Sequence, residues 1–281
     1  METYKVFNDA DMKAFEPEAK VGLLATVNPE GLPHITLITA LQASAPDQLI
    51  WGQFSEGMSK GHVLENPRTA FLIMTLDKHL WRGKALWTHK KQEGDEFEMF
   101  NNKPMFRYNS YFGIHTVHYM DLKETGGREK LPLVSIVLAS LLTKATKGGA
   151  KTGEPDSILK PWAEGVFNRL DSLKFLSWIG DDGFPELLPV IQCQASDSRR
   201  LSFSPLAYGK TLALLKEGQT AALFALTMDM EDVLVRGVFR GYRRSGPIKL
   251  GTVDIDWVYN SMPPTPGQIY PHTRIEPVMR F

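Results

Sequence analysis

The chain of 281 residues has one cysteine, no excess of charge of either sign and no run of basic residues. Because Cys193 cannot form a disulfide within the chain, folding does not depend on an oxidising compartment. Lysine plus arginine and aspartate plus glutamate both number 32, a balance that argues against a nucleic-acid or membrane-surface binder. Hydrophobic residues at 43% and charged residues at 23% are typical of a globular protein with a sizeable core.

Long hydrophobic segments and familiar catalytic motifs are also missing. The longest apolar stretch, from Leu131 to Leu142, contains a proline and two serines and is shorter than the roughly 20 residues that a spanning helix needs. We interpret it as a buried helix. The first five residues lack the basic and apolar parts of a signal peptide, so we expect a cytoplasmic protein without membrane association. No nucleophile elbow, Walker loop or Rossmann fingerprint occurs.

What the sequence does contain is an internal repeat. In both halves an apolar segment runs into a turn that closes on Gly-x-Pro, followed later by a lysine and then by Arg-Gly. The paired positions are Gly31 and Gly183, Lys60 and Lys210, and Arg82 and Arg236. Their separations of 152, 150 and 154 residues are nearly equal, which predicts a tandem duplication.

Each repeat has mainly the pattern of β-strands, with apolar residues alternating along short segments between turns. In the first repeat we expect strands at 21–27, 34–39, 49–51, 69–75, 80–87 and 117–123, and a helix at 59–65. In the second we expect strands at 175–179, 187–194, 201–204, 221–227, 233–242 and 253–259, and a helix at 211–216. Helices at 131–144 and 155–170 lie between them. The predicted fold class is mainly β, a closed β-barrel with flanking helices in each repeat, because closure removes exposed sheet edges. The predicted domains are 1–128, a helical linker at 129–165, and 166–281.

One segment of the first repeat has the composition of a phosphate site. After the third strand the chain turns through Ser55 and Gly57, and a helix begins at Ser59 and Lys60. Free amides at a helix start, together with serine hydroxyls and one lysine, suit a phosphate dianion. The alternative is an ordinary helix start with a solvated lysine.

The order of these motifs resembles the pyridoxamine 5'-phosphate oxidase-like family of FMN-binding split barrels. The residues that carry the resemblance are Gly31, Pro33, Ser55, Ser59, Lys60, Asn66 and Pro67, followed by Arg82 and Gly83. The resemblance covers most of the first repeat and, more weakly, the second. It implies two FMN-binding-type split barrels in tandem that pair within the chain as a pseudo-dimer, with FMN held between them.

The same resemblance implies which side chains hold FMN. In the first repeat they are His34, Thr36, Ser55, Ser59 and Lys60, with Arg82 facing the phosphate, facing the flavin ring, or serving only as a surface cation. The second repeat keeps Lys210 and Arg236 but has fewer hydroxyl groups, so we expect one flavin per chain rather than two.

Three other features invite a functional interpretation. His115 and His118 are three residues apart on a predicted strand, which puts them on opposite faces, and no acidic or cysteine partner lies at ligand spacing, so no metal is predicted. Cys193 lies in an apolar strand and is interpreted as core. The aromatic segment 106–112 covers a flavin, shapes a substrate pocket or packs a loop onto the barrel.

The function implied by the resemblance is that of an FMN-dependent oxidoreductase acting on a small organic substrate or electron acceptor. The flavin performs the electron transfer in such enzymes, so the lack of a catalytic triad does not argue against one. An electron donor such as NAD(P)H is expected, and the chain is expected to be a monomer with an internal pseudo-twofold or a homodimer. The alternative is a non-catalytic flavin, haem or deazaflavin binding or sensor protein.

Overall fold

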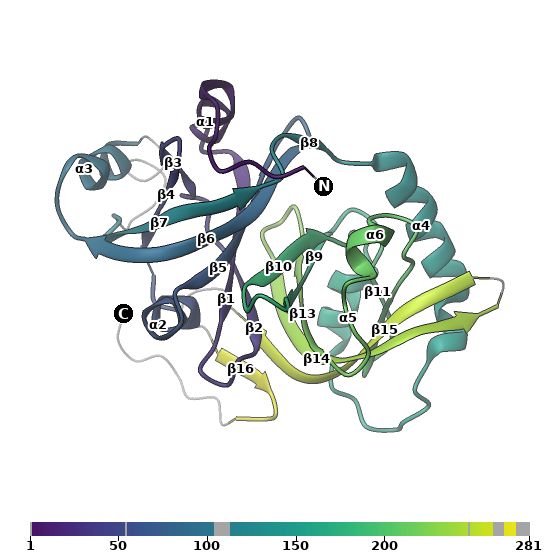
Figure 1. Ribbon diagram of the computed structural model, residues 1–281. Helices are drawn as coiled ribbons and strands as arrows, with labels where there is room; N and C mark the ends of the chain where they lie inside the picture. The colour runs from purple at the N-terminus through teal and green to yellow at the C-terminus, as the bar shows by residue number, and fades with distance from the viewer. Residues whose placement is uncertain (1, 54, 104–112, 247, 261–266, 274–281) are drawn as a thin grey trace. The chain divides into compact units, whose positions relative to one another are not determined.

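The computed structural model describes residues 2–53, 55–103, 113–246, 248–260 and 267–273 (Figure 1). The chain divides into two compact units. The first comprises Met1–Leu131 and Asp181–Leu187, and the second comprises Pro132–Gly180 and Leu188–Phe281. Two antiparallel sheets of eight strands each dominate the structure, and short helices flank them. The predicted fold class is confirmed: the chain is mainly β, with two units of the split-barrel type in tandem.

The first sheet follows the strand order β2-β1-β5-β6-β7-β4-β3, with β8 paired to β6. Its strands are β1 (Lys20–Val27), β2 (Pro33–Leu37), β3 (Gln42–Ala45), β4 (Gln48–Gln53), β5 (Arg68–Thr75), β6 (His79–Lys91), β7 (Thr116–Thr125) and β8 (Glu129–Lys130). The accompanying helices are α1 (Asp9–Phe15), α2 (Met58–Glu65) and α3 (Asp95–Asn102). Gly31 has a φ of 76° in the turn between β1 and β2, a conformation that glycine adopts without strain. The core of this unit is rich in aromatic residues, including Phe15, Trp51, Phe71 and Trp81.

The second sheet has the same order, β10-β9-β13-β14-β15-β12-β11, with β16 paired to β15. Its strands are β9 (Leu173–Ile179), β10 (Pro185–Pro189), β11 (Gln194–Asp197), β12 (Arg200–Phe203), β13 (Thr220–Leu226), β14 (Asp232–Ser245), β15 (Ile248–Asn260) and β16 (Gly267–Tyr270). The helical segments here are α4 (Leu133–Thr146), the 3-10 helix η2 (Lys147–Ala150), α5 (Pro161–Asn168) and α6 (Gly209–Leu212). Apolar side chains from both faces of these elements form a separate core around Phe203 and Phe239.

The strand predicted at 187–194 is wrong beyond Pro189, because it joins the end of β10 to the start of β11. The chain leaves β10 at Pro189 and enters β11 only at Gln194, and between them the amide of Cys193 donates to the carbonyl of Val190 over 2.7 Å. Val190 and Cys193 are both fully buried. Because this turn lies inside the core, it is as apolar as a strand, and its composition gave no sign of the break.

The interpretation of 131–144 as a buried helix is also wrong. Helix α4 buries only one side, which carries Ile136 and Ala139, and a row of large apolar side chains on the other side is exposed. The exposed residues are Leu133, Val134, Val137, Leu138 and Leu141. The helical stretch Leu133–Ala150 is long and apolar enough to cross a membrane by length and composition, with 22% of it buried; one such helix is weak evidence for a span.

Candidate functional site

Helix α2 lies against β1 and β2 in the first unit (Figure 1). It follows a glycine, Gly57, that supplies no side-chain cap, so the amides of the first turn are not satisfied by a capping side chain. The helix ends at Asn66 because Pro67 disfavours helical geometry in the residue before it. This segment therefore presents an uncapped, electropositive helix start of the kind that binds anions.

Ser59 lies in the first turn of this helix and is completely buried. Its hydroxyl has no hydrogen-bond partner among the described residues. A buried hydroxyl left unpaired costs about 1–3 kcal/mol, so native proteins rarely keep one without a reason. The unsatisfied hydroxyl is an independent sign that a polar ligand belongs at this helix start.

Lys60 stands next to Ser59 and is half-buried. Burial lowers the pKa of its ammonium group from the ordinary value of 10.5, and the nearby charge of Glu56 only partly opposes this. None of the side chains that the structure describes forms an ion pair with it. A Cβ atom added at Gly57 would lie 3.1 Å from Nζ of Lys60. The absence of a side chain at Gly57 therefore makes room for the ammonium group. The ammonium group is thus partly desolvated, and the charge of Glu56 compensates only in part without an ion pair, which favours an anionic ligand.

The structure brings His34 to the same helix. The buried ring of His34 meets the ring of His62 edge to face, with centroids 5.1 Å apart, and Nδ1 of His62 is 3.1 Å from the hydroxyl of Thr26. Thr36 is buried two residues further along β2, and Ser55 is half-buried just after β4. The roles of these side chains toward a ligand stay predictions.

The remaining predicted residues are placed elsewhere. Arg82, on β6, donates from Nε to Glu129 over 2.9 Å. In the second unit Lys210 is exposed on the four-residue helix α6, and Arg236 is buried on β14 with its guanidinium 3.9 Å from the ring centroid of Trp257. Arg82 and Arg236 thus have protein contacts of their own, and their part in a cofactor site stays a prediction.

A network around His118 was missed by sequence reasoning. The ring stacks on Trp51 with centroids 3.7 Å apart, and the indole N–H of Trp87 donates to Nδ1 of His118 over 3.1 Å. Because Nδ1 accepts, the ring proton is on Nε2, which donates to Oε1 of Gln53 over 2.8 Å. Burial, followed by the positive charges of Lys90, Lys60 and His115, lowers the pKa of His118 to about 3. His118 is therefore neutral at physiological pH, and both of its ring nitrogens are already bonded.

His118 and its partners come from three different strands, so no single sequence motif could have identified them. The available signal was the alternation of β4, β6 and β7, which places Trp51, Trp87 and His118 at positions that can share a face. The predicted aromatic segment 106–112 lies outside the described residues.

Comparisons with known proteins give structural likeness only. No protein family and no curated protein matches the chain by sequence. An FMN-binding protein from Syntrophomonas wolfei subsp. wolfei is 15% identical over 41% of this chain and 81% of its own, with a TM-score of 0.35. A putative pyridoxamine 5'-phosphate oxidase from Lactobacillus delbrueckii is 16% identical over 44% of this chain and 98% of its own, with a TM-score of 0.36. An F420 reductase is 16% identical over 42% of this chain and 98% of its own, with a TM-score of 0.34. At this identity and TM-score these likenesses carry no functional argument. Among solved structures, the chain is thus similar to FMN-binding, pyridoxamine phosphate oxidase-like proteins, over about two fifths of its length at a time.

Proposed function

We propose that the first unit binds FMN, with the phosphate at the start of α2, and that the chain is an FMN-dependent oxidoreductase of the pyridoxamine-phosphate oxidase-like type. The observation that carries the proposal is the pair formed by Ser59 and Lys60. One is a fully buried hydroxyl without a described partner, and the other is a partly desolvated cation that forms no ion pair with a described residue. A phosphate dianion supplies what both lack.

The residues present fit a phosphate group. The hydroxyl of Ser59 and the uncapped amides of α2 would donate to phosphate oxygens, and Lys60 would add a charge-assisted bond, which is stronger than a neutral one. The resemblance adds His34, Thr36 and Ser55 to the set. When bound, FMN supplies hydride or electron transfer through its ring, and the protein supplies binding and orientation.

The nearby His118 has a supporting role in this proposal. Its pKa of about 3 keeps it neutral, so it does not exchange protons with a substrate near neutral pH. Instead, hydrogen bonds to Trp87 and Gln53 hold the ring of His118 in place, and they fix the packing of side chains between β4 and β7. We infer that any proton needed in turnover comes from solvent or from the substrate.

We further propose that the chain arose by tandem duplication. The two sheets have the same strand order, and the motifs follow one another in the same order at similar spacing in both halves of the sequence. The second unit has an exposed Lys210 on a very short helix where the first has a half-buried Lys60 on a full helix start. We therefore infer one FMN per chain. As separate parts of the proposal, the chain acts in the cytoplasm on a small organic substrate or acceptor, with NAD(P)H as electron donor.

The test is the absorbance spectrum of the purified chain, recorded again after incubation with FMN and removal of free flavin. The expected result is a flavin spectrum near one equivalent per chain. A chain that retains no flavin would refute the cofactor proposal, and an intense Soret band would point to haem instead. If flavin is bound, anaerobic addition of NADH or NADPH should bleach it. Flavin that neither donor reduces would refute the proposed electron donor and favour a carrier or sensor.

A further inference from the structure

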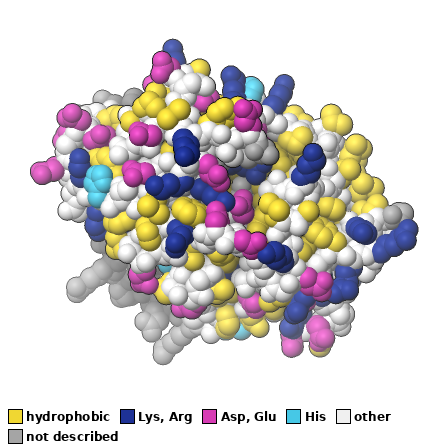
Figure 2. All heavy atoms as spheres, viewed as in Figure 1, with side chains coloured by type: hydrophobic (Ala, Val, Ile, Leu, Met, Phe, Trp, Pro, Cys, Tyr) yellow, Lys and Arg dark blue, Asp and Glu magenta, His cyan; other side chains and the backbone are white. Residues whose placement is uncertain are grey.

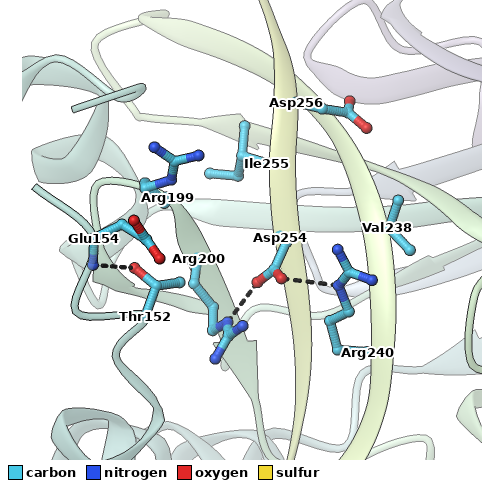
Figure 3. Close-up of a pocket in the computed structure, with 9 residues that line it drawn as sticks. All are labelled: Thr152, Glu154, Arg199, Arg200, Val238, Arg240, Asp254, Ile255 and Asp256. Atoms are coloured by element: carbon cyan, nitrogen blue, oxygen red, sulfur yellow. Dashed lines mark hydrogen bonds and ion pairs between the residues drawn. The ribbon is translucent and has the colours of Figure 1, made fainter. Parts of the chain in front are cut away.

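The second unit contains two adjoining cavities along the β14–β15 hairpin, the smaller of them near its end, and Figure 3 shows the larger. Their volumes are about 430 and 220 Å³, and both are lined by Arg200 and Arg240. Part of the lining comes from the glycine- and lysine-rich segment that follows α4, which contributes Ala150 to the smaller cavity and Thr152 to the larger. Neither cavity is lined by a residue of the proposed FMN site.

Asp254 joins the two shared arginines. Its Oδ1 accepts from Nε of Arg200 over 2.5 Å and its Oδ2 accepts from Nε of Arg240 over 2.8 Å, so one carboxylate holds two guanidinium groups (Figure 3). Partial burial alone would raise the pKa of Asp254, but the bonds from both arginines outweigh burial and lower it. Arg200 also donates from Nη1 to the carbonyl of Ala150 over 3.1 Å. Within the described part of the chain, the terminal nitrogens of Arg240 have no acceptor.

A β-bulge places further arginines at the smaller cavity. The register of β14 with β15 shifts between Phe239 and Tyr242, where Gly241 has a φ of 76°. The positive φ favours glycine at this position, and a Cβ there would also displace the carboxylate of Glu217, whose Oε2 would be 2.5 Å away. The extra residue in the bulge changes the alternation of side chains, which allows Arg240 and Arg243 to line the same cavity.

The smaller cavity is therefore strongly cationic. Its charged lining consists of Arg200, Arg240, Arg243 and Arg244, with no carboxylate. Asp254 and Glu217 pair with three of these arginines from outside the lining, and Arg244 has no ion pair with any residue that the structure describes. Two positive charges remain in excess. Figure 2 shows Lys and Arg side chains gathered over this end of the hairpin.

The larger cavity has a different character. Glu154 and Asp256 supply carboxylates, Thr152 supplies a hydroxyl, and Val238 and Ile255 supply apolar surface (Figure 3). Such a lining suits the hydroxyl and amino groups of a sugar or base, whereas the arginine-lined cavity suits a phosphate. The larger cavity, at about 430 Å³, is within the range of small-molecule sites, and the smaller one, at about 220 Å³, has room for a phosphate group only as an extension of it.

We propose that the Arg200–Asp254–Arg240 bridge is the centre of a site for a phosphorylated small molecule of the nucleotide class. The phosphate lies among the four arginines of the smaller cavity, and the rest of the molecule extends toward Glu154 and Asp256. Asp254 acts as a positioning residue, because it uses the Nε atoms of both arginines and leaves Nη2 of Arg200 and both terminal nitrogens of Arg240 for the ligand. This inference does not depend on FMN binding in the first unit.

The experiment is calorimetric titration of the full chain with ADP, pyrophosphate and adenosine, before and after saturation with FMN. We expect ADP to bind at one equivalent per chain, pyrophosphate more weakly, and adenosine not detectably. Added salt should weaken ADP binding, since part of the site is exposed. Arg244→Gln should raise the Kd for ADP about tenfold, the equivalent of about 1.4 kcal/mol. Arg244 is exposed and has no described partner, so its replacement should leave folding intact.

Two control variants distinguish binding at this bridge from nonspecific charge attraction and from binding at α2. Lys160→Gln removes one positive charge from an exposed position of the same unit outside both cavities and should leave the Kd unchanged. Lys60→Met should leave ADP binding intact, and loss of ADP binding in this variant would place ADP at α2 and overturn the proposal. Three other results would also overturn the proposal. They are adenosine binding as tightly as ADP, an unchanged Kd for ADP in Arg244→Gln, and tight binding of single-stranded DNA without detectable binding of ADP.

Discussion

Replacing Lys60 by methionine tests whether its ammonium group serves a phosphate. Methionine keeps most of the apolar stem and removes only the charge. In the chain without FMN, the partly buried ammonium group loses hydration and gains no ion pair among the described residues, so Lys60→Met should unfold at the same or a higher denaturant concentration than wild type. In the FMN-bound chain the same change removes a charged hydrogen bond of about 1.5–3 kcal/mol, which raises the Kd for FMN about 10- to 150-fold.

The pH dependence of stability gives an independent check on the direction of the Lys60→Met effect in the chain without FMN. Because burial lowers the pKa of Lys60 in the folded chain, the unfolded chain binds more protons at pH values between the two pKa values. The cost of burying the ammonium group is therefore fully present at lower pH and fades as pH rises above the folded pKa. Without FMN, the stability advantage of Lys60→Met should shrink as pH increases toward 10.5. Chemical denaturation of both chains at several pH values measures this.

The control for Lys60 is Lys210→Met, because Lys210 occupies the corresponding place in the second half and is exposed. FMN titration, followed by the quenching of flavin fluorescence, should give nearly the wild-type Kd for this variant. Wild-type affinity in Lys60→Met would remove Lys60 from the site. Loss of FMN binding in Lys210→Met would show that the phosphate binds in the second unit instead.

Three further predictions concern single positions. Ser59→Ala removes a buried hydroxyl without a described partner, so the FMN-free chain should gain about 1 kcal/mol of unfolding free energy while FMN affinity falls; a loss of stability without FMN would show that the hydroxyl is bonded within the protein. Lys174 is fully buried, and burial lowers its pKa to about 8, so Lys174→Met should be more stable than wild type at pH 7, with an advantage that declines between pH 8 and 10.5. A constant advantage over that range would contradict the lowered pKa. Gly241→Ala places a Cβ against Glu217 at a φ of 76° and should lower the melting temperature, whereas an unchanged melting temperature would mean that the bulge relaxes easily.

Much of the fold could be predicted because its signals are local. Alternating apolar residues identified β1, β5 and β13 to within one or two residues, and the Asn66–Pro67 pair fixed the end of α2. Helix α5 begins at Pro161, later than the expected residue 155, because proline suits the first turn and the chain before it is irregular. Residues 155 and 161 are both prolines, so the preference of proline for the first helical turn does not by itself show where α5 begins.

Other elements depend on contacts that the sequence does not display. Helix α1 is short and is capped by Asn8 and Asp11, a reciprocal pair that was readable but easily missed without a long apolar stripe. The exposed face of α4 could not be distinguished from a buried one, since the helix is apolar on nearly all sides. Burial depends on what packs against a helix, and this is decided by the tertiary fold.

The candidate site divides in the same way. The serine and lysine at the start of α2 are adjacent in sequence, so their motif could be recognised directly. The bonds of His118 and the pairing of Arg200 and Arg240 through Asp254 join residues that are 31 to 65 and 14 to 54 positions apart. Such pairs form only when strands are placed side by side, and their residue types carry no distinctive spacing.

The stacking of Trp51 on His118, with Trp87 bonded to the same ring, also gives the protein a built-in optical reporter. A protonated imidazole quenches indole emission far more strongly than a neutral one, and the pKa of about 3 keeps this ring neutral across the range used for enzyme assays. The emission of these two tryptophans should therefore stay constant through changes of pH that would alter most histidine-paired indoles. A change in their emission on adding a ligand would report on the packing between β4 and β7 itself, without an introduced label.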